Sequence, residues 1–105
     1  MNVNDIIITK HAIERFRERC PTPSLKNHGN TEWVIKMLLA KAIPIRFSKE
    51  HMVKRLLSNS MEYADYFYSE GYIFVCSENK PKTLITVEFQ EGRQFGVDFF
   101  RLDTH

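Results

Sequence analysis

The chain has 105 residues, of which 43% are hydrophobic and 27% charged, and its formal net charge is +2. This composition is that of a folded globular protein and argues against an intrinsically disordered one. No apolar run approaches the roughly 20 residues that a transmembrane helix needs, and residues 1–5 lack the features of a signal peptide. We therefore expect a single domain over residues 1–105, located in the cytoplasm with no membrane contact.

Charge is distributed unevenly along the chain. Residues 1–58 hold eleven Lys and Arg against five Asp and Glu, a net charge of +6. Residues 59–105 hold four against eight, a net charge of −4. A basic surface attracts nucleic acid, because each neutralised phosphate releases counterions, and it can equally dock an acidic protein. An ordinary mixed surface is the third interpretation.

The opening segment predicts an amphipathic helix. Thr9 is a suitable N-cap, because its hydroxyl can accept a hydrogen bond from an unpaired amide of the first turn. Two prolines prevent the helix from continuing beyond about Cys20. At 100° per residue its apolar side chains share a face that points to a core. His11, Arg15 and Glu18 lie on the opposite face, within about 60° of one another.

Two more helices are expected further along. Residues 21–30 are rich in turn formers and predict a loop. The next helix is expected to bury Trp33 and Met37 among its apolar residues, and to end at Pro44. Ser48 is the expected cap of a third helical segment.

From about residue 62 the hydrophobic period changes to two, which indicates strands. Four strands with short hairpin connections are expected, at Ala64–Ser69, Tyr72–Ser77, Thr83–Phe89 and Phe95–Leu102. The helical part of about residues 9–58 and the sheet of about residues 62–102 predict an α+β fold. In this fold the N-terminal helices pack on one face of a four-stranded antiparallel meander sheet.

The second face of this sheet is expected to be partly open. Tyr66, Tyr68, Thr86 and Glu88 are the candidates to line it, because alternate positions of a strand share a face. Exposed tyrosines on a sheet can stack nucleobases, or they can form cross-strand pairs within a core. The sequence leaves both interpretations open.

The polar face of the first helix also has two interpretations. Imidazole exchanges protons near neutral pH and a guanidinium holds phosphate through a planar fork. His11 and Arg15, one turn apart, therefore suit the binding and cleavage of a phosphodiester. The alternative is a solvated helix face on which Arg15 pairs with Glu18. Cys20 and Cys76 lack metal-ligand spacing, so no metal site is expected, and no cofactor is indicated.

The motif Thr9-Lys10-His11-Ala12, followed by Arg15 and Glu18-Arg19, resembles the opening helix of RelE-like and BrnT-like toxin-related domains. Members of that group often begin with a basic helix of the form His-Ala-x-x-Arg-x-x-x-Arg and finish with a four-stranded antiparallel sheet. The resemblance covers residues 6–20 by motif and residues 62–90 by layout. The loop at 21–30, the third helical segment and the strand after Gly92 depart from the pattern.

The resemblance implies a metal-independent ribonuclease fold that activates the ribose 2′-hydroxyl. His11 is then the expected general base or acid, Arg15 the residue that stabilises the phosphate, and Thr86 a contributor from the sheet. The nucleic-acid-binding residues expected are Lys10, Arg15, Arg19, Lys54 and Arg55. RNA is the expected partner, and an acidic antitoxin or regulatory protein and a homodimer are further expectations. The alternative is a non-catalytic phage or mobile-element protein that binds a protein or a nucleic acid.

Overall fold

A computed structural model of the protein describes residues 2–58, 63–78, 80–90 and 92–102. Its elements are the 3-10 helix η1 (Val3–Asp5), β1 (Ile7–Ile8), α1 (Lys10–Arg19), α2 (Pro23–Lys26), α3 (Thr31–Ala40), β2 (Ile43–Phe47), α4 (Lys49–Ser58), β3 (Ala64–Ser69), β4 (Tyr72–Ser77), β5 (Thr83–Phe89) and β6 (Phe99–Arg101). The α+β class is confirmed. None of the helices in the described ranges has the length and apolarity needed to cross a membrane.

The strands form one mixed sheet of six, in the order β1-β5-β4-β3-β2-β6. All neighbours are antiparallel except β1 and β5, which run parallel through Ile7 and Ile8. The predicted four-stranded meander is therefore wrong. β3, β4 and β5 do form a meander with the expected bounds, but β1 extends the sheet at one edge, and β2 and β6 extend it at the other.

Two local signals were insufficient to predict the sheet edges. The helix expected to reach Pro44 ends at Ala40, and Pro44 lies inside β2, opposite Phe67. A proline stops a helix, but an extended strand accepts its fixed φ where its missing N–H is not needed. The strand expected over Phe95–Leu102 is shortened to β6, because Gly96 adopts a φ of +86° in a turn that precedes it. β6 pairs with β2 and not with β5.

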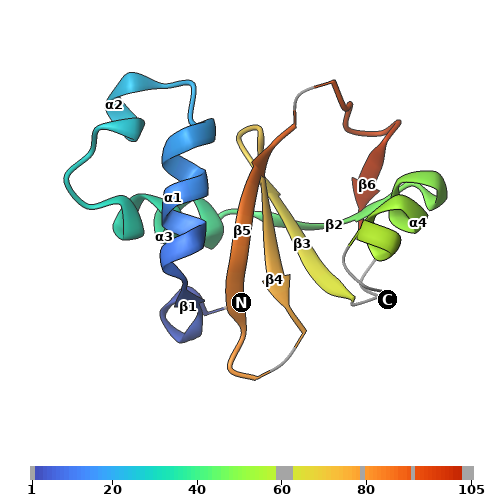
Figure 1. Ribbon diagram of the computed structural model, residues 1–105, viewed down its shortest axis with the longest axis horizontal. Helices are drawn as coiled ribbons and strands as arrows, with labels where there is room; N and C mark the ends of the chain where they lie inside the picture. The colour runs from blue at the N-terminus through green and yellow to red at the C-terminus, as the bar shows by residue number, and fades with distance from the viewer. Residues whose placement is uncertain (1, 59–62, 79, 91, 103–105) are drawn as a thin grey trace.

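Helices cover both faces of the sheet. Phe74 of β4 belongs to the core under α1 and α3, whereas its neighbours Ile73 and Val75 belong to a second core that packs against Met52 of α4. Figure 1 shows α1, α2 and α3 together on one side of the strands, and α4 with β6 on the other. The prediction of helices on one face is wrong, because β4 is buried from Tyr72 to Cys76 and a strand that is apolar on both faces needs cover on both.

The buried face of α3 also differs from the prediction. Trp33 is 53% exposed and Met37 is 38% exposed, although both are apolar. The helix instead buries Val34, Ile35, Leu38 and Leu39, with its N-terminal Thr31. Trp33 stacks on the imidazole of His28, with 5.5 Å between the ring centroids. This aromatic pair lies on the surface and adds nothing to the core.

The placement of α1 beside the sheet depends on its cap. Thr9 Oγ1 accepts a hydrogen bond from the Ala12 N–H at 3.1 Å, which confirms the predicted N-cap. The same hydroxyl donates to the carbonyl of Leu84 in β5 at 2.8 Å. Ala12 and Phe16 are fully buried below the helix. One threonine therefore both starts α1 and fixes its first turn to the edge of the sheet.

Candidate nucleic-acid cleft

A cleft of about 850 Å³ lies between α1 and the outer edge of β5, and we refer to it as the α1–β5 cleft. It brings together His11, Arg15 and Arg19 from α1 with Thr86 from β5. The other residues that line it are Glu18, Cys20, Pro21, Ile85, Glu88, Phe89 and Arg93. Within the described residues β1 pairs with β5 only at its start, so the remainder of that edge has no strand beside it and is available to the cleft.

Arg19 attaches the last turn of α1 to this edge. Its Nη1 donates a hydrogen bond to the carbonyl of Val87 at 2.6 Å. An edge strand leaves such carbonyls without a partner strand, and a charged donor satisfies one of them here. A guanidinium has five N–H donors, so Arg19 retains donors for a ligand in the cleft.

His11 and Arg15 lie on the exposed side of α1. Arg15 Nη1 forms an ion pair with Glu18 Oε2 at 2.5 Å, between side chains that are 38% and 56% exposed. Exposed pairs of this kind contribute about 0–1 kcal/mol, so a phosphate can compete with Glu18 for the guanidinium. His11 is exposed and lines the cleft, and among the described residues no side chain is hydrogen-bonded to its ring.

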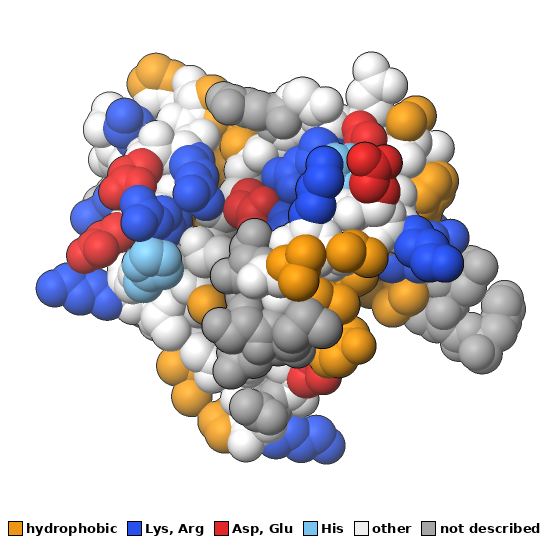
Figure 2. Space-filling model, turned by 45° about the vertical axis from the view of Figure 1, so that its right-hand side comes forward, with side chains coloured by type: hydrophobic (Ala, Val, Ile, Leu, Met, Phe, Trp, Pro, Cys, Tyr) orange, Lys and Arg blue, Asp and Glu red, His pale blue; other side chains and the backbone are white. Residues whose placement is uncertain are grey.

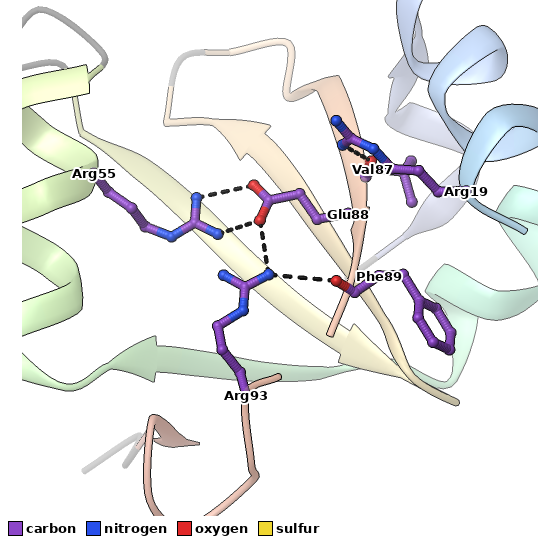
Figure 3. Close-up of polar contacts among 6 residues, drawn as sticks. All are labelled: Arg19, Arg55, Val87, Glu88, Phe89 and Arg93. Atoms are coloured by element: carbon purple, nitrogen blue, oxygen red, sulfur yellow. Dashed lines mark hydrogen bonds and ion pairs between the residues drawn. The ribbon is translucent and has the colours of Figure 1, made fainter. Parts of the chain in front are cut away.

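Glu88 connects the cleft to the opposite layer of the molecule. Its carboxylate accepts two hydrogen bonds from Arg55 of α4, at 2.9 and 2.5 Å, and one from Arg93 at 3.0 Å. Figure 3 shows the two arginines converging on this carboxylate from different elements. Burial raises the pKa of Glu88, but the hydrogen bonds and charges of Arg55 and Arg93 outweigh it, and the pKa lies below its ordinary value. Glu88 is therefore ionised near neutral pH.

Arg55, one of the predicted nucleic-acid-binding residues, belongs to this network and not to the lining of the cleft. Its side chain is 14% exposed, and its guanidinium lies over the rings of Phe47 and Tyr66, 4.0 and 4.9 Å from their centroids. These contacts and the two bonds to Glu88, made through Nη1 and Nη2, hold the guanidinium against its protein partners. Stacking on aromatic rings and a two-point ion pair are typical of an arginine that stabilises the fold.

The two lysines predicted to bind nucleic acid also lie outside the cleft. Lys54 is an exposed residue of α4, 3.7 Å from the carboxylate of Glu50. Lys10 is exposed at the first position of α1 and is not among the lining residues. Of the five residues expected to bind nucleic acid, Arg15 and Arg19 line the α1–β5 cleft. Their role stays a prediction.

The four residues predicted to share the second sheet face do share it. Tyr66 and Thr86 are both paired with Val75, and Tyr68 and Glu88 are both paired with Ile73. The face is nevertheless not an open platform, because Tyr66 is 5% exposed under the Arg55 network. Burial raises the pKa of the Tyr66 hydroxyl above its ordinary value. Only the β5 end of this face reaches the cleft.

Arg93 is the lining residue that the sequence did not reveal. It follows β5 in a turn, where no period or motif indicates which way a side chain points. With Arg93 the cleft is lined by three arginines, two glutamates and one histidine. Figure 2 shows basic, acidic and histidine side chains interspersed on one face of the molecule, and the face is not uniformly basic. Lys41 and Arg55 pair with Glu70 and Glu88, so the positive charge of residues 1–58 is partly neutralised by acidic residues of the second half.

Within the ranges that the structure describes, no group of three or more His, Cys, Asp or Glu side chains is arranged to hold a metal ion. No protein-family model matches the chain, and neither a curated protein nor a solved structure is similar enough to count as a match.

Proposed function

We propose that the protein is an RelE/BrnT-like RNA-binding protein of the toxin type, and that the α1–β5 cleft cleaves RNA without the help of a metal ion. The observation that carries this proposal is the convergence of His11, Arg15, Arg19 and Thr86 on one cleft. Three of these residues come from one helix, but Thr86 comes from a distant strand. A proton-exchanging group and two phosphate-binding groups are the parts that this reaction needs, and Thr86 adds a hydroxyl that can hydrogen-bond the phosphate.

The chemistry is an internal transfer of the phosphodiester. The ribose 2′-hydroxyl attacks the adjacent phosphorus, and the bond from phosphorus to the 5′-oxygen breaks. The proton of the 2′-hydroxyl passes to a base, and the 5′-oxygen gains a proton as it leaves. The products are a 2′,3′-cyclic phosphate and a 5′-hydroxyl, so no water is consumed. His11 serves as the base or the acid, and solvent water exchanges the other proton. Arg15 and Arg19 stabilise the negative charge on the non-bridging oxygens.

One observation favours the alternative, a non-catalytic binding protein. A histidine that acts as a base is commonly oriented by a third group. Among the described residues no side chain is hydrogen-bonded to the ring of His11, so its orientation depends on the ligand. In this alternative the arginines hold a nucleic acid or an acidic partner, and His11 takes no part in a reaction.

The test is incubation of the purified protein with single-stranded RNA in the presence of a chelator. Wild type is expected to produce ends with a 2′,3′-cyclic phosphate, and His11→Ala to be slower by about 100-fold or more, because general acid–base catalysis contributes about that much. The matched control is His28→Ala, which removes a histidine that stacks on Trp33 outside the cleft. It should cleave as wild type does.

Equal cleavage by wild type and His11→Ala would contradict the catalytic role. Binding of RNA by all three proteins without cleavage by any would favour the non-catalytic alternative. Loss of cleavage in His28→Ala as well would indicate damage to the fold, which the thermal midpoint of each variant would reveal.

A further inference from the structure

Two arginines are anchored to the same edge of β5. Arg19 donates to the carbonyl of Val87 at 2.6 Å, and Arg93 Nη2 contacts the carbonyl of Phe89 at 3.4 Å. The backbone N–H of Gln90 donates to Gly71 at the start of the β4 ladder. In an antiparallel pair the bonded residues alternate, so Phe89, like Val87, directs its carbonyl away from β4. Figure 3 shows Arg19 at the carbonyl of Val87 and Arg93 at the carbonyl of Phe89, two residues further along the strand.

The spacing of these two anchors follows from strand geometry. Residues two apart on a strand are separated by about 6.6 Å, since each residue advances the chain by about 3.3 Å. This length is comparable to the distance between neighbouring phosphates of an extended nucleic-acid strand. Arg19 and Arg93 both line the α1–β5 cleft, so their guanidinium groups are available to a ligand there.

The charge of Arg93 is not cancelled by its partner. Glu88 is shared with Arg55, which takes both carboxylate oxygens, so the three side chains together carry a net charge of +1. Arg93 contacts Glu88 and Phe89 through one nitrogen, Nη2, which leaves Nε and Nη1 as donors. Its side chain is 20% exposed and stacks over Phe47, which restricts its position before a ligand arrives.

We propose that Arg93 is a second phosphate-binding residue, and that Arg19 and Arg93 hold neighbouring phosphates of one RNA strand. This inference rests on the proposed binding of RNA in the cleft, and it narrows the ligand to a polynucleotide strand. A mononucleotide offers one phosphate and would use only one of the two arginines.

The experiment measures the affinity of a short 2′-O-methyl RNA strand, which cannot be cleaved, by fluorescence anisotropy at several salt concentrations. The slope of log affinity against log salt counts the phosphates that a protein contacts, at about 0.7 per phosphate of a single strand. Arg93→Gln and Arg19→Gln are each expected to lower that slope by about 0.7 and to weaken binding at low salt. Arg93→Lys should keep the slope, because it keeps the charge.

The matched control is Arg46→Gln, since the Arg46 guanidinium lies over Phe100, outside the cleft. An unchanged slope in Arg93→Gln would overturn the inference, and so would an equal drop in Arg46→Gln. If Arg93→Gln does not fold, a reduced slope in Arg93→Lys overturns it as well. Absence of binding by wild type overturns both the inference and the proposed function. Binding with the expected slopes, but without cleavage of ordinary RNA, supports the inference and rejects only the proposed cleavage.

Discussion

The carboxylate of Glu88 lies between an arginine from α4 and an arginine from the turn after β5. Its side chain is 23% exposed, so the three charges are partly removed from water. Removing one charged partner from such a partly buried group is destabilising, because the remaining charges are then buried without an opposite charge. A single residue thereby links the layer under α4 to the wall of the cleft.

Glu88→Gln is expected to lower the free energy of unfolding by about 1–3 kcal/mol near pH 7, because two guanidinium groups then lack a neutralising partner. The pKa of Glu88 is lowered in the folded protein, so its contribution is complete above the ordinary value of 4.5 and is lost as the pH falls through the lowered value. Urea unfolding of wild type and Glu88→Gln at about pH 7 and about pH 3 measures the difference in their free energies of unfolding.

The stability difference between wild type and Glu88→Gln should shrink at the acidic pH. A difference that stays constant with pH would show that the charge of Glu88 does not stabilise the fold. Glu14→Gln is the control, since Glu14 is exposed on α1. It should leave the free energy of unfolding nearly unchanged at both values of pH.

At the scale of elements, α1 and β5 could each be predicted from the sequence, whereas the packing of α1 against β5 could not. A cap, a helical period and two prolines define α1 locally, and a period of two defines β5. Their contact depends on hydrogen bonds across the chain, from Thr9 to Leu84 and from Arg19 to Val87. For the same reason, helix spacing in the sequence predicted that His11 and Arg15 lie together. It did not predict Arg93, whose position depends on contacts with Glu88 and Phe47.

Thr9→Ala is expected to lower the free energy of unfolding by about 1–2 kcal/mol, because it removes both the N-cap bond and the bond to β5. Thr9→Ser keeps the hydroxyl and should retain most of the stability. Chemical unfolding monitored by far-UV circular dichroism compares the two variants. Equal stability of the alanine and serine variants would mean that the hydroxyl does not hold α1 in place.

At the scale of the whole molecule, the sheet separates two hydrophobic cores and contributes side chains to both. The sequence contained a sign of this arrangement, because β4 is apolar at five consecutive positions, and an alternating pattern was expected instead. Cys76 of β4 is fully buried and Cys20 is 5% exposed. Both cysteines belong to the core below α1 and α3, where the hydroxyl of Tyr72 donates to the sulfur of Cys20 at 3.0 Å. Cys20 also lines the α1–β5 cleft, whereas Cys76 does not.

Cys76 is expected to react with a thiol reagent only when the protein unfolds. Burial raises the pKa of Cys76 to about 12, so its reactive thiolate is scarce at mildly alkaline pH. The rate of labelling, measured over a urea series, should rise with the same midpoint as the loss of secondary structure. Rapid labelling of Cys76 in the native protein would show that the core under α1 opens without global unfolding.

The shortness of β1 has a consequence for how copies of the protein behave toward one another. A bare strand edge is a template on which another chain can add a strand, and this is a common start of aggregation. At the end of the β1 pairing, the Thr9 hydroxyl donates to the carbonyl of Leu84, and beyond it the Arg19 guanidinium donates to the carbonyl of Val87. Arg19 occupies an acceptor that an incoming strand would need, and it brings a charge that such a strand would have to bury. Arg19, which we propose to bind RNA, thus also hinders strand pairing between the β5 edges of two copies of the protein.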